Sequence, residues 1–250
     1  MQQEAYAALH RLDSVHWWFV GARYIYRSLL EIGLGNESKN PRMLEVGCGS
    51  GGNLSTLSAF GPTVGLDVSS LALAMIKVRP QLGLVQAKAE ALPFSADSFD
   101  SVNLWGVIEH LEDDLMGLRE AWRVSRPNGT VTLLTSALPA LWSHHDEANL
   151  HKRRYVRNQL ADLLRIAHLL PIRLTYQNFF AFFPTLVIRF IQRFFVVSPK
   201  YDMGPQISWI NTLMIKLLKF EALFIKKFEF PIGVDLIAVC RVYKKNSGNV

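Results

Sequence analysis

The residues best suited to chemistry lie between Trp142 and Tyr155, a stretch with three histidines, two acidic and three basic side chains. Histidine exchanges a proton near neutral pH, so it can take the proton of a hydroxyl group as that oxygen attacks an electrophile. We expect His145, His151 and the separate His110 to be candidate bases, with Asp146 as an orienting residue or alternative base. The spacing favours no zinc site, so we expect no metal.

The same stretch offers groups that could hold an acceptor molecule. Guanidinium groups match the oxygens of phosphates and carboxylates, so Arg153 and Arg154, with Lys152, could clamp such a group. A solvated charge run is the alternative interpretation. We expect Trp142, Arg153, Arg154 and Tyr155 to contact the acceptor.

A glycine-rich turn lies in the segment 43–54, where an apolar strand leads into a helix. Glycines in such a turn let a ligand approach the backbone closely. Gly47, Gly49 and Gly52 also satisfy the dinucleotide pattern G-x-G-x-x-G, and Asp67 ends the next strand where ribose hydroxyls are held. The turn therefore predicts a cofactor that contains a nucleoside, without choosing between a nicotinamide dinucleotide and another nucleoside.

Further segments settle on one family. The sequence Glu45-Val46-Gly47-Cys48-Gly49-Ser50-Gly51 resembles the first motif of the class I S-adenosylmethionine-dependent methyltransferases. The resemblance continues, in order, through the segments Val64–Ser69, Ala89–Phe94, Phe99–Val102, Val107–Leu111 and Arg123–Thr130. It covers the region from Met43 to Thr135.

The resemblance implies S-adenosylmethionine as the cofactor and methyl transfer as the activity. The cofactor contacts that it implies are Glu45, Gly47, Cys48, Gly49, Gly51, Asp67, Val68, Ala89, Glu90 and Trp105. Asp67 would accept hydrogen bonds from both ribose hydroxyls. Lys88 departs from the family, which often has an acidic residue there, so an adenine contact would come from Glu90, a backbone carbonyl or a water.

The segment Leu141–Tyr155, with His16-Trp17-Trp18-Phe19, is similar to a bacterial subgroup of these enzymes associated with glycan and lipid-linked sugar assembly. This implies O-methylation of a glycan precursor, a lipid-linked sugar or a similar amphiphile. One alternative is an NAD(P)-dependent oxidoreductase, although a Tyr-x-x-x-Lys pair is missing. Another is a non-enzymatic membrane module with a degenerate methyltransferase fold. Nucleic acid is disfavoured because the basic residues lie among phenylalanines.

Short strand patterns alternate with helical ones from Arg42 onward, which is typical of an α/β fold. We expect a Rossmann-like, seven-stranded, mostly parallel sheet with an antiparallel last strand and helices on both faces. The predicted strands are Arg42–Val46, Thr63–Leu66, Leu82–Gln86, Ser101–Trp105, Thr130–Thr135, Ile172–Tyr176 and Asp235–Val242. The predicted units are an N-terminal helical cap (1–40), the cofactor-binding domain (41–178 and 232–245) and a helical insertion (179–231). The segment Tyr6–Ile32 should pack on the sheet's edge or over its site.

The insertion is rich in phenylalanine, with eleven of the chain's 15, and holds seven basic but three acidic residues. We expect two basic amphipathic helices, Thr185–Val197 with Arg189 and Arg193 on one face, and Ile207–Phe228. In the second helix, Glu221 predicts some protein contact. Its lysines, Lys216, Lys219, Lys226 and Lys227, are expected opposite an apolar face of Ile210, Leu213, Leu217, Phe220, Phe224 and Phe228. These helices could lie on an anionic membrane surface, on the domain or on a second subunit.

Composition limits the class of protein. Half of the residues are hydrophobic and 19% are charged, so the chain folds, and two cysteines exclude a disulfide framework. The net charge of +6 does not by itself indicate which class of partner the protein binds. The longest uncharged run in the insertion, 174–188, is shorter than the roughly 18 to 20 residues of a spanning helix. Because the N-terminus lacks a signal-peptide pattern, we expect a cytoplasmic protein, with peripheral attachment to the membrane as an option.

Overall fold

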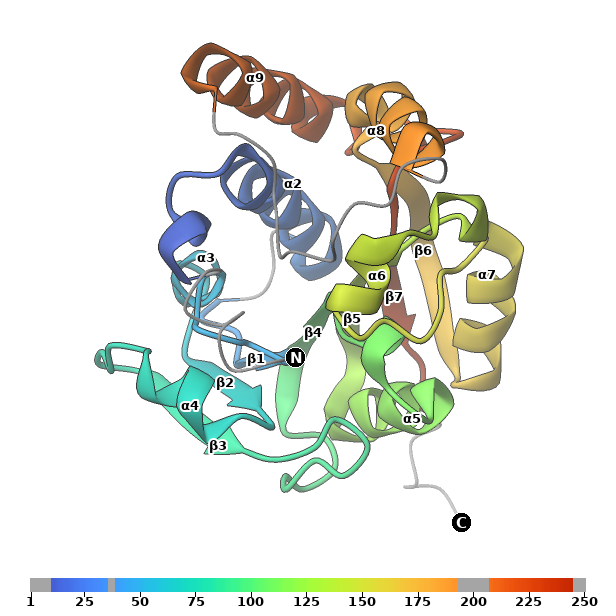
Figure 1. Cartoon of the computed structure of the whole chain (residues 1–250). Coiled ribbons are helices and arrows are strands. Elements are labelled where there is room, and N and C mark those ends of the chain that lie inside the picture. Colours follow the sequence, from blue (N-terminus) through green and yellow to red (C-terminus); the bar gives the residue numbers. More distant parts are fainter. Residues whose placement is uncertain (1–9, 36–38, 193–206, 245–250) are drawn as a thin grey trace.

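The computed structural model describes residues 10–35, 39–192 and 207–244, which form an α/β fold around one mixed sheet (Figure 1). The strand order is β3-β2-β1-β4-β5-β7-β6. The strands are β1 (Met43–Val46), β2 (Thr63–Asp67), β3 (Leu82–Gln86), β4 (Phe99–Trp105), β5 (Ser125–Ser136), β6 (Leu169–Gln177) and β7 (Asp235–Val242). β7 pairs antiparallel with both β5 and β6, and β1 to β5 pair in parallel. The predicted fold class is confirmed.

Helices cover both faces of the sheet. They are α2 (Trp17–Leu34), α3 (Leu54–Ser58), α4 (Ser70–Ala74), α5 (Asp114–Val124), α6 (His144–Ala148), α7 (Arg157–Ile166), α8 (Phe179–Gln192) and α9 (Ser208–Phe224), with short 3-10 turns η1 (Ile108–His110) and η2 (Pro139–Leu141). Side chains alternate along β7, as they do in any strand. Leu236 and Ala238 join the core beneath α5 and α7, whereas Ile237 and Val239 join the core beneath α2 and α9.

Four strands, β2, β4, β5 and β6, are longer than the patterns predicted. β5 begins at Ser125, because its polar start pairs with Phe99 before a register shift in β4. Asn128 in this segment has φ 61°, a left-handed conformation that asparagine adopts more readily than most residues. Polar turn residues therefore extend the strand where sequence patterns predict a loop.

The N-terminal helix lies on a face of the sheet and not at its edge. The other predicted placement, over the site, agrees with Asp13 and Phe19 of this segment, which line the cavity described below. α2 packs on β5 and β7, and α9 packs against α2 from outside. The two helices cross closely at Gly21, where an added Cβ would lie 2.3 Å from Cδ1 of Leu218. Ser28 Oγ also donates a buried hydrogen bond of 3.0 Å to the carbonyl of Ala222. An N-terminal helix and the insertion therefore share one layer.

The protein contact predicted for Glu221 is confirmed. Its carboxylate is buried and accepts hydrogen bonds from the backbone N–H groups of Asn178 (2.7 Å) and Phe179 (3.2 Å), at the start of α8. Burial raises the pKa of Glu221 to about 7, although the two hydrogen bonds act in the opposite direction. One carboxylate therefore joins α9 to the first turn of α8.

The buried side of α9 is not the predicted apolar face. In α9 the buried side chains are Leu218, Glu221 and Ala222, with Ile225 just beyond. Leu213, Phe220, Phe224 and Phe228 of the predicted apolar face are exposed, so this face does not pack on the domain. Apolar residues lie on nearly every side of α9, so the spacing of its apolar residues does not identify the buried face. The close packing of α9 against Gly21 of α2 does. Arg193, expected to share a face with Arg189, lies outside the described residues.

Within the described ranges, no helix has both the length and the apolar character needed to span a membrane.

Replacing Gly21 with alanine should destabilise the fold at the α2–α9 crossing. The new methyl group would overlap Leu218, and overpacking of this kind costs about 1–3 kcal/mol. Alanine recovers about 1 kcal/mol of helix propensity, so we expect a net loss of about 1–2 kcal/mol in urea unfolding. Gly83→Ala is the control, since its Cβ would lie 3.5 Å from Val64, an ordinary contact. Equal midpoints for the two variants would contradict the close crossing.

Candidate functional site

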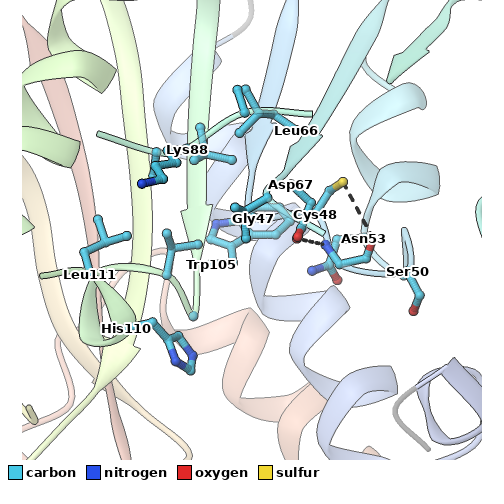
Figure 2. Close-up of a pocket in the computed structure, with 18 of the residues that line it drawn as sticks. Gly47, Cys48, Ser50, Asn53, Leu66, Asp67, Lys88, Trp105, His110 and Leu111 are labelled. Atoms are coloured by element: carbon cyan, nitrogen blue, oxygen red, sulfur yellow. Dashed lines mark hydrogen bonds between the residues drawn. The ribbon is translucent and has the colours of Figure 1, made fainter. Parts of the chain in front are cut away.

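A cavity of about 500 Å³ opens at the carboxyl ends of β1, β2, β3 and β4 (Figure 2). β2 and β3 are added on one side of β1, and β4 and the later strands on its other side, so the strand order switches between β1 and β4. Ligands bind at such a switch point in open α/β sheets. The implied cofactor contacts that line the cavity are Gly47, Cys48, Gly49, Asp67, Val68, Ala89, Glu90 and Trp105. Lys88 lines it as well. The structure thus brings together segments that are far apart in the sequence.

The glycine turn has a backbone that other residues rarely adopt. Gly47, Gly49 and Gly51 have φ values of 71°, 52° and 87°. An added Cβ at Gly47 would lie 2.6 Å from Cγ2 of Val107. Gly51 does not line the cavity, and its role is to turn the loop. The turn therefore leaves backbone, without side chains, along the cavity wall.

Asp67 ties the glycine turn to the end of β2. Its Oδ2 accepts a hydrogen bond from the Gly49 N–H, and its Oδ1 accepts one from the Ser69 N–H, both at 2.8 Å. The carboxylate is buried but lines the cavity. A carboxylate has about four lone-pair sites, so two stay available for hydroxyl donors of a ligand.

Glu45 lies beneath the turn and does not line the cavity. Its Oε1 accepts a 3.2 Å hydrogen bond from the Asn53 side chain, whereas its buried Oε2 has no partner. Burial raises the pKa of Glu45 to about 8; the Asp13 and Asp67 carboxylates act in the same direction, and the hydrogen bond from Asn53 acts against it. Glu45 is therefore mostly protonated at pH 7, and the carboxylates that favour a positively charged ligand at this end of the cavity are those of Asp13 and Asp67.

Asp13 is a cavity residue that the sequence did not indicate. Its carboxylate lies against Gly52, so close that an added Cβ there would be 2.1 Å from Oδ1, and it pairs with Arg23 at 3.0 Å. In dinucleotide-binding folds the pyrophosphate lies at the start of the helix after this turn. A carboxylate in that place repels phosphate, so the structure disfavours a nicotinamide dinucleotide.

Other cavity residues were also missed by sequence reasoning. They are Phe19 from α2 and Leu111 and Glu112 after η1. Lys152, predicted from the sequence as part of a clamp, does line the cavity and pairs there with Glu112. Phe19 belongs to the aromatic run His16–Phe19, but this run by itself does not indicate which distant residues Phe19 meets in the fold. Trp105 is held in place by Tyr26, whose ring stacks on it at 4.1 Å between centroids.

The four expected catalytic residues do lie together. The ring centroid of His110 is 4.7 Å from that of His151, which is 6.4 Å from that of His145. His151 Nδ1 is 2.9 Å from Oδ1 of Asp146. Only His110 lines the cavity, opposite the glycine turn (Figure 2). Burial lowers the pKa of His110 below its ordinary value and lowers that of His145 to about 4.

The structure gives Asp146 an architectural position, which corrects its expected role as a base. It is fully buried, pairs with Arg154 at 2.8 Å and accepts a 2.9 Å hydrogen bond from the Ser143 N–H at the start of α6. Burial acts to raise its pKa, but the hydrogen bond from His151 and the charge of Arg154 hold it well below its usual range. A carboxylate so held is a poor proton acceptor.

The expected acceptor contacts are likewise turned away from the cavity. Arg154 donates to the carbonyl of Ala137 as well as to Asp146, and its side chain is only 3% exposed. Arg153 pairs with Asp114 at 2.8 Å, and the Tyr155 hydroxyl donates to the same carboxylate at 2.6 Å. Trp142 does not line the cavity either. These side chains position the loop that carries the histidines.

Comparison with known proteins agrees with this geometry. A family profile described as "Methyltransferase domain" matches residues 44–133, from β1 into β5. This segment is therefore similar to a methyltransferase domain, over 90 of the chain's 250 residues. Demethylmenaquinone methyltransferases of Roseiflexus castenholzii and Staphylococcus aureus are 34% and 35% identical over 104 and 111 residues, 39% and 41% of this chain. The alignments span 44% and 46% of those relatives, less than half of their length.

Solved structures extend the likeness in fold beyond this domain. Phosphoethanolamine N-methyltransferase 2 of Haemonchus contortus, with S-adenosyl-L-methionine, has a TM-score of 0.57 at 17% identity, covering 86% of this chain and 51% of its own. Geranyl diphosphate C-methyltransferase of Streptomyces coelicolor, with S-adenosyl-L-homocysteine, has a TM-score of 0.58 at 12% identity, covering 87% of this chain and 76% of its own. At these identities the likeness shows the fold alone.

S-adenosylmethionine fits the methyltransferase domain's cavity on the chain's own evidence. Its methionine part carries an ammonium and its sulfur a positive charge, which suits an end of the cavity lined by the carboxylates of Asp13 and Asp67. The glycine turn leaves backbone open for close approach, and Asp67 has acceptor capacity for ribose hydroxyls.

Asp13→Asn and Asp67→Ala should weaken different parts of cofactor binding. We expect Asp13→Asn to weaken the binding of S-adenosylhomocysteine about tenfold. A charge-assisted contact to the ligand's ammonium is worth about 1.5–3 kcal/mol, and asparagine retains part of that contact. Methylthioadenosine, which lacks the amino-acid part, should bind as before. Asp67→Ala should weaken both ligands on the order of 100-fold, since two charge-assisted bonds are lost.

Titration calorimetry measures both affinities, and Asp162→Ala on the surface of α7 is the matched control. A tenfold loss of methylthioadenosine binding in Asp13→Asn would contradict the placement of Asp13 at the amino-acid end.

Proposed function

We propose that the protein transfers the methyl group of S-adenosylmethionine to a hydroxyl of an amphiphilic small molecule, with His110 as the base. The observation that carries this proposal is the position of His110, the one expected base that lines the cavity. The bound cofactor supplies an electrophilic methyl group. The chain's residues supply the cofactor cradle, the orientation of the acceptor and a place for its proton.

His110 suits proton removal because burial lowers its pKa, which keeps its ring neutral at pH 7. Once protonated, the ring would be stabilised by the nearby carboxylate of Glu109, which acts to raise the pKa of His110. Glu109 is itself fixed by a 3.0 Å hydrogen bond from the Thr135 hydroxyl. The ring edge of His151, tied to Asp146, limits how His110 can turn.

Positioning supplies much of the rate in such a displacement, because the acceptor oxygen must approach the methyl carbon in line with the bond that breaks. Phe19, Trp105 and Leu111 give the cavity apolar walls. Apolar walls exclude water, which would compete with the acceptor. The stacked pair of Tyr26 and Trp105 keeps one wall rigid.

The acceptor class rests on two lines of support. The names of two similar proteins contain demethylmenaquinone and geranyl diphosphate, both lipid-like molecules. The segments Leu141–Tyr155 and His16–Phe19 resemble a subgroup associated with lipid-linked sugar assembly. A hydroxyl of a lipid-linked sugar is therefore the acceptor that we propose, with a prenylated quinol as the second candidate that the relatives' names favour.

The acceptor can be tested with cofactor that carries a radioactive methyl group. Purified protein is incubated with polyprenyl-linked sugars, with the same sugars without lipid, or with demethylmenaquinol, and the label in each acceptor is counted after its separation from the cofactor. We expect label in the lipid-linked sugar. Label in the quinol alone would move the acceptor to the relatives' class, and label in the free sugar alone would contradict an amphiphilic acceptor.

Replacing His110 by glutamine should lower kcat on the order of 10²- to 10⁴-fold, the usual contribution of a general base. Affinity for S-adenosylhomocysteine should stay close to that of the original protein, since the cofactor cradle is intact. His144→Gln is the matched control, because His144 is exposed and pairs only locally with Glu147 among the described contacts. Equal turnover in the two variants would remove His110 from the reaction.

The pH profile gives a second readout of the same residue. Because the pKa of His110 is lowered, its ring stays neutral to a lower pH than a free histidine. We expect kcat/KM to be flat above about pH 6.5, the ordinary histidine value, and to fall as pH decreases through the lowered pKa. His110→Gln should lack this acid limb.

A further inference from the structure

Helices α8 and α9 expose large apolar side chains on the outside of the molecule. The most exposed are Phe183, Val187 and Phe190 on α8, Trp209 and Leu223 on α9, and Phe228 just after it, at 56% to 67% exposure. We call the exposed apolar side chains of these two helices and Phe228 the outer face. α8 and α9 contact each other and lie at one end of the molecule, away from α5 (Figure 1). Contiguous exposed apolar surface of this kind marks an interaction site.

The first half of α8 buries Ala181 and Phe182, but its second half exposes apolar side chains and turns its charged residue inward, unlike an ordinary surface helix. Its charged residue Arg189 is half-buried on the protein side, near the charges of Asp146 and Arg154, whereas Val187 and Ile188 face outward. A surface helix normally buries its apolar side and exposes its charges. This reversal indicates that the environment outside α8 is itself apolar.

The exposed charges beside the outer face on α9 are basic. Lys216 and Lys219 lie on α9, and Lys226 and Lys227 follow it directly. The acidic residue of α9, Glu221, is buried beneath α8. Lys226 pairs with Glu31 of α2. The apolar surface is therefore flanked by positive charge.

We propose that the outer face docks on the surface of an anionic lipid bilayer, with its apolar side chains in the interface and its lysines at the head groups. Basic helices with aromatic apolar sides bind membranes in this way. A second copy fits less well, because a two-fold dimer through this face would place the same lysines near one another. The docking does not depend on methyl transfer.

Aromatic side chains at the start of α2 lie between α8 and the cavity. Trp17 and Trp18 pack against the buried cluster that holds Leu141 and Phe182 of α8, and Phe19, next in sequence, lines the cavity. The helix that carries part of the outer face is therefore joined to the cavity wall through this packing.

Sedimentation with lipid vesicles tests the proposal on the whole chain. Vesicles of phosphatidylcholine alone are compared with vesicles that contain phosphatidylglycerol in equal part. We expect binding to the anionic vesicles and release as salt rises from about 0.1 M to about 1 M, which shortens the Debye length from about 10 Å to about 3 Å. Lys216→Gln with Lys227→Gln should weaken binding about 30-fold, roughly fivefold for each lysine.

The apolar part is tested with Phe183→Ser and Leu223→Ser, each expected to weaken vesicle binding about tenfold or more. Ile166→Ser, at a similarly exposed position on α7, and Lys39→Gln with Lys77→Gln are the controls and should bind as the original protein does. Unchanged affinity for S-adenosylhomocysteine shows that each variant is folded.

Three outcomes would overturn the proposal. They are no vesicle binding, binding of equal strength to neutral vesicles that salt does not reverse, and equal losses in the control variants. A dimer in light scattering that Leu223→Ser dissociates, with no vesicle binding, would assign the outer face to a second copy.

Discussion

The cavity depends on the hydrogen bonds that the Asp67 carboxylate accepts from the N–H groups of Gly49 and Ser69. They hold the glycine turn, whose left-handed backbone is costly for other residues, against the end of β2. The same carboxylate lines the cavity. The Asp67 side chain thus both stabilises the turn and presents acceptor oxygens to a ligand. A change at Asp67 therefore alters the loop geometry and the ligand site together.

A second buried carboxylate organises the opposite side. Asp146 holds Arg154, the start of α6 and the ring of His151. This arrangement explains why the segment 142–155, which is rich in histidine, acidic and basic side chains, contributes few of them to the cavity. Most of its charges neutralise one another inside the protein, because a buried charge requires a partner. The result is a rigid support behind His110, which alone of the expected bases reaches the cavity.

The apolar content of the chain is divided between two different tasks. The sheet and the helices α2, α5 and α7 bury their apolar residues in the two cores. α8 and α9 bury only a narrow strip, closed by Glu221 and Leu218, and leave large side chains outside. Cofactor binding and docking thus use opposite sides of the shared aromatic run at the start of α2.

The seven strands along the chain, the glycine turn and Asp67 could be predicted from the sequence, because they depend on local period and on residue types that few backbones tolerate. The strand over Asp235–Val242 was predicted to the residue. The place of Asp13 against Gly52, the buried pairing of Asp146 with Arg154 and the inner face of α9 were decided only by the tertiary structure. Local patterns show which side chains can be buried or charged. Which partner each one meets depends on contacts between distant segments, and those exist only once the sheet has brought them together.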